Sequence, residues 1–150
     1  MIVTFVGHSH IEGGEILLEN IKETIKASVC GRDSVTFYCG GYGDFDELCA
    51  RACRELKGEI PHGEVVFVTP YITAAQQKQL SYFLQSGLYD AVIYPPLETV
   101  PPRFAISKRN EWMIHEADLV IAYVSYTYGG AYKTLQHAKR QKKNIINLSM

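Results

Sequence analysis

The sequence predicts an α/β protein, a three-layer α/β/α sandwich around a mostly parallel central sheet of about six strands. Short β-rich runs alternate with helix-length amphipathic segments from one end of the 150-residue chain to the other. Most of the short runs are almost continuously apolar, the pattern of strands buried on both faces of a parallel sheet. No linker, repeat or low-complexity segment interrupts the alternation, so we expect one domain over residues 1–150.

Each strand of this sheet is predicted from a β-rich apolar run. The runs are Ile2–Val6, Val35–Cys39, Val65–Thr69, Ala91–Tyr94, Leu119–Val124 and Asn144–Leu148. Two proline pairs, Pro95-Pro96 and Pro101-Pro102, bracket a loop after the fourth run and do not mark a domain boundary.

Between the strands, apolar residues recur at the spacing of amphipathic helices. The stripes are Leu18, Ile21, Ile25 and Val29 in the first helix; Phe45, Leu48, Ala52 and Leu56 in the second; Leu80, Phe83 and Leu84 in the third; and Ile106, Met113 and Ala117 in the fourth. The fifth helix is expected from about Gly130 to Lys142.

The composition limits the function classes. Fifteen basic and sixteen acidic residues give a formal charge of −1, which argues against a protein that coats DNA or RNA, although a small anionic ligand stays possible. The N-terminal apolar run has no charged segment before it and is too short to span a bilayer. We therefore expect a cytoplasmic protein without membrane contact. Its four cysteines, Cys30, Cys39, Cys49 and Cys53, are expected to be reduced and structural.

In an open parallel sheet, ligands bind beyond the carboxyl ends of the strands, where the strand order switches. The loop after the first strand begins Gly7-His8-Ser9-His10, in which Gly7 allows a sharp turn and the polar side chains can donate to a phosphate or a ribose hydroxyl. The alternative is a turn whose polar residues cap the next helix.

The loop after the second strand is glycine-rich and leads directly into a helix. Bare N–H groups at Gly40, Gly41 and Gly43 and the positive end of the helix dipole would suit an anion. Asp44 with Glu47 three residues later fits a capping box. Asp46 is then the freer carboxylate, either accepting a ribose hydroxyl or lying solvated in the first helical turn.

The loop after the fourth strand places Arg103, Lys108 and Arg109 at a helix N-terminus. Cations there oppose the helix dipole by roughly 0.3–1 kcal/mol each, which suggests that the charges have a use. If Met113 faces the sheet, Arg109 one turn earlier faces the crevice, where a guanidinium suits phosphate or carboxylate. The alternative for Arg103 and Arg109 is pairing with an acid, namely Glu98, Glu111 or Glu116.

The loop after the fifth strand contains Gly129-Gly130, again at a helix start, flanked by tyrosines that can stack on a base or line an interface. The basic run Lys139–Lys143 ends this helix, where cations are favoured, and is interpreted as a solvated cap.

Taken together, these motifs resemble the SLOG superfamily, Rossmann-like proteins that include the Lonely Guy and DprA groups. The residues that carry the resemblance, in order, are Gly7-His8, Gly40–Asp46, Pro101–Arg103, Arg109-Asn110-x-x-Met113 and Gly129-Gly130. The chain looks closest to the YpsA-like branch of unknown function. The resemblance covers essentially the whole chain and implies a Rossmann-like fold, a nucleotide-derived ligand in the crevice, and a homodimer or higher homo-oligomer.

The Lonely Guy enzymes are phosphoribohydrolases, and their Arg-x-x-x-Met pattern is matched by Arg109 and Met113. Their glycine-rich loop is only partly matched, with Tyr128 and Tyr132 in place of a proline and a glycine. Gln136 stands where the family has a glutamate, and a glutamine cannot exchange protons as a carboxylate does.

We therefore predict a module that senses or sequesters a nucleotide or its derivative. The glycine loops would hold phosphate, Arg109 would pair with it, and Asp46 would contact ribose. The glycines of these loops are Gly40, Gly41, Gly43, Gly129 and Gly130, and Gly7, His8 and Arg103 would also contact the ligand. The alternative is an N-glycosidic hydrolase or transferase acting on nucleoside monophosphates, with Asp46 or Glu47 as acid/base and Arg109 as phosphate clamp. A third possibility is an interaction scaffold with a vestigial crevice. No cofactor is expected, and no metal, because the histidines lack ligand spacing.

Overall fold

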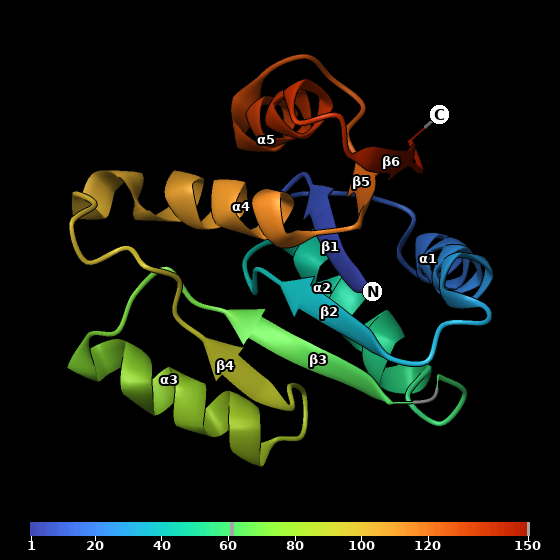
Figure 1. The fold of residues 1–150 in the computed structure, drawn as a ribbon, viewed down its shortest axis with the longest axis horizontal. Helices are drawn as coiled ribbons and strands as arrows, with labels where there is room; N and C mark the ends of the chain where they lie inside the picture. Colours follow the sequence, from blue (N-terminus) through green and yellow to red (C-terminus); the bar gives the residue numbers. More distant parts are fainter. Residues whose placement is uncertain (61, 150) are drawn as a thin grey trace.

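The structure is a computed structural model that describes residues 1–60 and 62–149, except for the side chain of Phe83. Strands and helices alternate through this part of the chain (Figure 1). The strands are β1 (Ile2–Gly7), β2 (Val35–Cys39), β3 (Gly63–Val68), β4 (Ala91–Ile93), β5 (Leu119–Tyr123) and β6 (Asn144–Asn147). The helices are α1 (Gly14–Val29), α2 (Asp44–Glu55), α3 (Ala74–Gln85), the 3₁₀ turn η1 (Pro102–Phe104), α4 (Ala105–Glu116) and α5 (Gly129–Arg140).

All six strands form one parallel sheet in the order β4-β3-β2-β1-β5-β6. Val3 of β1 lies opposite Phe37 of β2 on one side and Leu119 of β5 on the other, so β1 is central. The chain proceeds outward from β1 to β4 and then returns to the other side of β1 at β5. This order confirms the predicted Rossmann-like sandwich and places the switch in strand order between β1 and β5.

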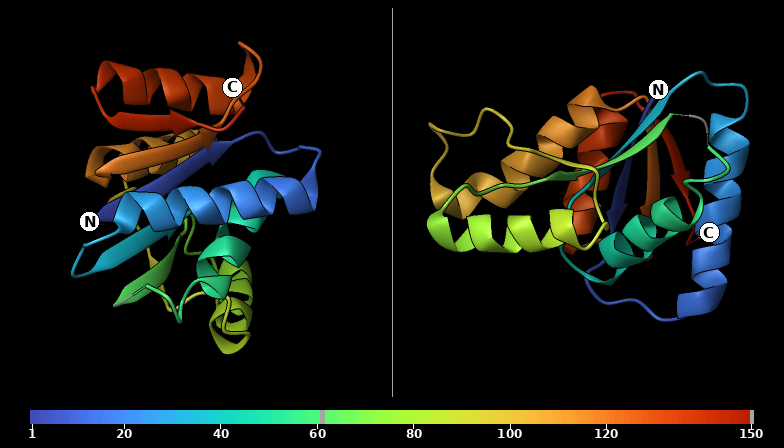
Figure 2. Two further views of the ribbon diagram at one scale, coloured as in Figure 1. Left: turned by 90° about the vertical axis from the view of Figure 1, so that its right-hand side faces the viewer. Right: turned by 90° about the horizontal axis from the view of Figure 1, so that it is seen from below.

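The first three helices pack on one face of the sheet, and α4 and α5 pack on the other (Figure 2). The predicted stripe of α1 is fully buried, from Leu18 to Val29. In α2, Phe45 and Ala52 are buried and Leu48 is partly buried, while Leu56 caps the helix and is also buried. The predicted periods of these two helices are confirmed because each helix buries one apolar stripe against the sheet.

The third and fourth helical stripes are less well buried than predicted. In α3, Leu80 packs partly on the core and Leu84 is 45% exposed, because β4 is a short edge strand that offers little surface to cover; the side chain of Phe83 lies outside the described residues. In α4, Met113 is buried but Ile106 is 44% exposed.

Three of the four cysteines, Cys39, Cys49 and Cys53, are buried between the sheet and α2, and all four are free thiols. Burial raises the pKa of the Cys49 and Cys53 thiols, which keeps them protonated. In the part of the chain that is described, no helix has both the length and the apolar character needed to cross a membrane.

Candidate functional site

A crevice of about 300 Å³ opens beyond the carboxyl ends of β1 and β5, at the switch in strand order. Its walls come from β1, the loops that follow β1 and β5, the facing helices α4 and α5, and the turn after β2 with the start of α2. Six of the predicted site residues line it, namely Gly7, His8, Asp46, Arg109, Gly129 and Gly130.

His8 joins the loops after β1 and β5. Its ring is buried, and its Nε2 accepts a hydrogen bond of 2.9 Å from the backbone N–H of Ser125. Desolvation lowers the pKa of His8, so the ring is neutral at pH 7. Because Nε2 is an acceptor, the neutral ring carries its proton on Nδ1. His8 can therefore donate only through Nδ1, a narrower role than the sequence predicted.

The rings of His8, Tyr126 and Tyr128 are stacked on one another and lead from the buried His8 to the surface; we call this stack the ring ladder. The centroids of His8 and Tyr126 are 3.6 Å apart with the rings 7° from parallel, and those of Tyr126 and Tyr128 are 4.3 Å apart at 27°. The Tyr128 side is the exposed end, since this residue is 68% exposed. The ladder therefore presents a supported aromatic surface at the rim of the crevice, of the kind on which a base stacks.

The N-terminus of α5 lies beside this ladder. Tyr128 is the N-cap residue, and its side chain does not bond the backbone of the first turn. Gly129 has a φ of +89°, and a Cβ added at Gly129 or Gly130 would find no described atom within 4 Å. The first N–H groups of a helix lack partners within the helix, and they carry the positive end of its dipole. This end of α5 is thus chemically suited to an anionic oxygen.

Arg109 lies deeper in the crevice, where its guanidinium is hydrogen-bonded to other groups of the same chain. Its residue is only 2% exposed, and its Nη1 donates to the carbonyl oxygens of Gly40, at 2.8 Å, and Val68, at 2.7 Å. Its Nε donates to Oδ1 of Asn110 at 2.9 Å. The guanidinium therefore ties α4 to the ends of β2 and β3. The predicted alternative, in which Arg109 pairs with a glutamate, is wrong. The hydrogen bonds of Arg109 go to two backbone carbonyl oxygens and an amide oxygen, and Glu111 pairs with Lys108 instead.

Asp46 is the carboxylate that interacts electrostatically with Arg109. Its Oδ2 accepts a hydrogen bond of 3.2 Å from the N–H of Tyr42, within the turn that follows β2. Desolvation raises the pKa of Asp46 to about 6, against the opposing effects of the Arg109 charge and the Tyr42 hydrogen bond. At neutral pH this carboxyl is therefore close to its titration range and can act as either an acceptor or, when protonated, a donor.

The glycines of the turn after β2 allow close packing and do not form an open anion-binding loop. A Cβ at Gly41, which has a φ of +75°, would lie 1.9 Å from the Phe67 ring, and one at Gly43, with a φ of +91°, would lie 2.8 Å from Cα of Ser9. These two residues border a different cavity. Gly40 lies against Asp46 and Arg109.

The predicted capping box at the start of α2 is wrong. The N-cap is Gly43, without a side-chain cap, and Asp44 is the first helical residue. The Asp44 carboxylate instead accepts from the N–H of Ile11 at 3.2 Å and lies 3.3 Å from Nδ1 of His10. Asp44 therefore holds the loop after β1 rather than its own helix.

Arg103 is not brought to the crevice. It lies exposed in η1, with its guanidinium 4.8 Å from the centre of the Phe104 ring. Gln136 also lies outside the crevice, in a neighbouring groove between α4 and α5. Within the described residues, no group of three His, Cys, Asp or Glu side chains is placed to hold a metal ion.

One feature of the site is absent from the sequence predictions. All sixteen acidic residues lie before Leu119, whereas residues 119–150 contain five of the fifteen Lys and Arg residues and no Asp or Glu. This segment forms β5, α5 and β6, and its loop after β5 and the first turns of α5 form one wall of the crevice. Counting charge by segment rather than over the whole chain would have revealed it.

No family model and no curated protein matches the chain. Among the solved structures that share its fold are two of DNA processing protein A (DprA). The protein from Streptococcus pneumoniae aligns with a TM-score of 0.63 at 14% identity, over 95% of this chain and 48% of its own. The protein from Helicobacter pylori aligns with a TM-score of 0.63 at 13% identity, over 97% of this chain and 63% of its own. The chain thus spans about half to two thirds of the length of these proteins.

The expectation of a small-molecule partner, with no coating of nucleic acid, is corrected by this comparison. The Helicobacter pylori protein, which shares the fold, is described by its single-stranded DNA binding mode. The argument from net charge fails because a sum over the chain hides the acid-free segment after Asp118. Binding to a nucleic acid depends on local charge and aromatic surface, and a formal charge of −1 constrains neither.

Proposed function

We propose that the crevice binds single-stranded nucleic acid, with a base stacked on Tyr128 and a backbone phosphate at the N-terminus of α5. The observation that carries the proposal is the ring ladder His8–Tyr126–Tyr128, which ends on an exposed ring. A ring supported from beneath loses little conformational freedom when a base stacks on it. Stacking of this kind accepts any base and needs an unpaired strand.

The groups around the ladder fit the other parts of a nucleotide unit. The first turn of α5 offers N–H groups to a phosphate, and open space over Gly129 and Gly130 lets the phosphate approach. The buried Arg109 adds positive charge behind this position, and its direct contact with phosphate remains a prediction. The Nδ1 proton of His8 is a further donor for a sugar or phosphate oxygen.

Two lines of reasoning support a polymer rather than a free nucleotide. The shared fold includes a protein described as binding single-stranded DNA, although at 13% identity only the fold itself carries over. The crevice is also open at its rim, where Tyr128 is 68% exposed, so a strand can continue past it. A SLOG-type assignment within the Rossmann-like fold, and the YpsA-like branch in particular, rests on the motif order alone.

Fluorescence anisotropy with a labelled oligothymidylate of about 12 nucleotides, within the usual range of single-strand site sizes, tests the proposal. We expect Tyr128→Ala to weaken binding by roughly 5- to 150-fold, because base–aromatic stacking contributes about 1–3 kcal/mol. Tyr128→Phe should retain most of the affinity. Tyr82→Ala is the matched control, since Tyr82 is 67% exposed but lies on α3, away from the crevice.

Duplex DNA of the same length and free thymidine monophosphate serve as competitors. The proposal requires that the unlabelled single strand compete best, because a duplex keeps its bases stacked within the helix and a mononucleotide lacks the neighbouring phosphates. If the wild-type protein does not bind the oligonucleotide, or if Tyr128→Ala and Tyr82→Ala behave alike, the proposed function is wrong.

A second candidate function, cleavage of the N-glycosidic bond of a bound nucleotide unit, has one observation in its favour. The pKa of about 6 for Asp46 suits a general acid that works near neutral pH. Free base released from an oligonucleotide by the wild-type protein, and absent with Asp46→Asn, would support this activity. Oligonucleotide that is bound by the wild-type protein but recovered intact would exclude it.

A further inference from the structure

A groove between α4 and α5 continues from the crevice. It has a volume of about 500 Å³ and shares part of its walls with the crevice, namely Ile106, Asn110, Gly130 and Thr134. A ligand that fills the crevice and extends past these shared residues therefore meets this groove. The sequence motifs predicted no role for this groove.

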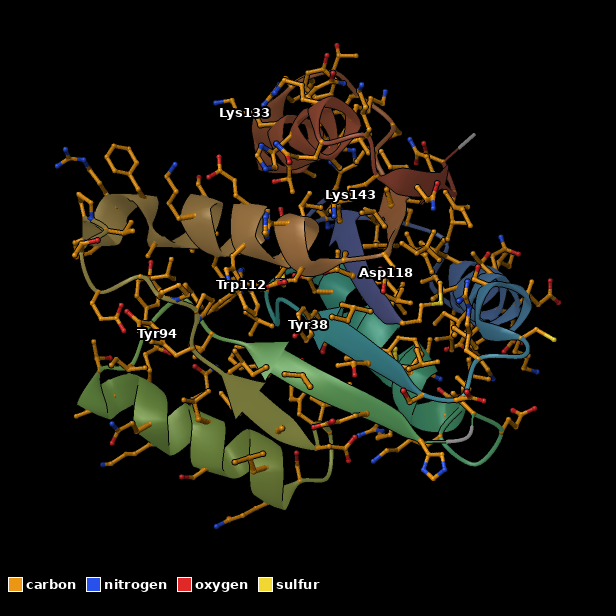
Figure 3. All side chains as sticks on the ribbon, in the orientation of Figure 1. Tyr38, Tyr94, Trp112, Asp118, Lys133 and Lys143 are labelled. Atoms are coloured by element: carbon orange, nitrogen blue, oxygen red, sulfur yellow. The ribbon has the colours of Figure 1, made fainter. Side chains whose placement is uncertain are left out.

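We propose that this groove carries the strand out of the crevice, an inference that rests on the proposed function. Lys133, His137 and Arg140 line its α5 side, four and three residues apart on one face of the helix. Seven residues of α-helix rise about 10.5 Å, so the stripe spaces its charges along the groove. Lys133 extends from α5 into solvent, as Figure 3 shows.

Lys133 and Arg140 are available to a ligand. Within the described residues, the ion pairs engage neither Lys133 nor Arg140, whereas the single acid in the groove, Glu111, is occupied by Lys108 at 3.1 Å. No other acid is near in sequence, because residues 119–150 contain none. The free positive charge of the groove thus complements a polyanion.

The junction of the two cavities adds an apolar contact. Ile106 lines both the crevice and the groove and is 44% exposed, and Tyr132 lines the groove beside Lys133. Exposed apolar side chains between stripes of charge suit the sugar and base of a nucleotide whose phosphate faces the cations. An acidic peptide would use the charges but would have no use for continuity with the ring ladder.

The test compares oligothymidylates of about 4 and about 12 nucleotides, a short strand for the crevice alone and one long enough to continue into the groove. Lys133→Gln with Arg140→Gln removes the two groove charges. Lys139→Gln with Lys142→Gln is the matched control, because it removes the same charge from the same segment but neither residue lines the groove. Binding is measured by anisotropy over a series of salt concentrations.

We expect the groove variant to lower the slope of log K against log salt by about 1.4 for the long strand, at about 0.7 per phosphate contact. One decade below a 1 M reference, this corresponds to a loss of about 25-fold in affinity. The short strand should bind the groove variant as it binds the wild type, and the control variant should keep the wild-type slope.

Equal losses in the groove and control variants would overturn the inference, since only the general field would then matter. Equal losses for short and long strands would also overturn it. If polyglutamate lowers the affinity of the long strand to that of the short strand and leaves the short strand bound, the groove binds an acidic peptide instead. If the wild type binds neither strand, the proposed function itself is wrong, and that outcome is distinct from all of these.

Discussion

Replacing Arg109 by Met tests whether the hydrogen bonds of this residue hold α4 against the ends of β2 and β3, a role that we call the clasp. The substitution keeps an unbranched apolar side chain and removes the guanidinium, which leaves the carbonyl oxygens of Gly40 and Val68 without their donor at Nη1. Both residues are buried, and an unsatisfied buried acceptor is unfavourable by about 1–3 kcal/mol. We therefore expect the free energy of unfolding to fall by about 2–6 kcal/mol, partly offset by relief of the desolvated charge.

Urea unfolding followed by circular dichroism measures this change, with the slope m checked for constancy. Arg103→Met is the control, because Arg103 is exposed, and its free energy of unfolding should stay within about 0.5 kcal/mol of the wild type. A loss below about 1 kcal/mol in Arg109→Met would refute the clasp, since the two carbonyls would then be satisfied in some other way.

Arg109→Lys separates the clasp from a phosphate clamp. An ammonium group can donate to the two carbonyl oxygens but cannot also reproduce the planar fork that reaches Asn110. If this variant unfolds near the wild-type urea concentration yet loses most of its affinity for the oligonucleotide, Arg109 contacts phosphate directly. If stability falls while the affinity of the folded protein is kept, its role is structural.

Two further predictions concern charge and space in the site. Because the pKa of Asp46 is raised to about 6 from an unfolded value of about 3.9, folding binds a proton between these values, and the free energy of unfolding falls by about 2–3 kcal/mol as pH rises from 4 to 6. Asp46→Asn should remove this part of the pH dependence, and a profile parallel to the wild type would contradict the assignment. Gly7→Ala should lower the free energy of unfolding by about 1–3 kcal/mol, since its Cβ would meet the Phe45 ring at 2.2 Å. Gly130→Ala should not destabilise the protein, because the space around Gly130 is open. Urea unfolding of both variants measures the difference.

The fold was predictable because its signals are local. An apolar run such as Leu119–Tyr123 predicts a strand buried on both faces, and the stripe from Leu18 to Val29 predicts a helix with one buried face. Both patterns are complete within a single element. The location of the crevice followed from a further general rule, that parallel strands expose their carboxyl ends at one edge, which needed only the order of the strands.

The contacts within the site could not be predicted from neighbouring residues. Arg109 was correctly placed on the crevice side of α4, but its acceptors lie 69 and 41 residues away in the sequence, at Gly40 and Val68. The capping box failed for the same reason. The carboxylate of Asp44 accepts from the backbone N–H of Ile11, which comes from another loop, and this tertiary contact replaces the local one.

Under the proposed function, the arrangement of the site would divide the recognition of a strand between two kinds of contact. In the crevice, the stacked rings act at short range and change little with salt, and the backbone N–H groups of α5 offer a place for a single phosphate. Along the groove, Lys133 and Arg140 act through charges that salt screens. A strand that occupies only the crevice should therefore bind with weak salt dependence, and each phosphate added over the groove should steepen it. A chain with a formal charge of −1 can hold a polyanion in this way, because its sixteen acids all lie before the segment that provides α5.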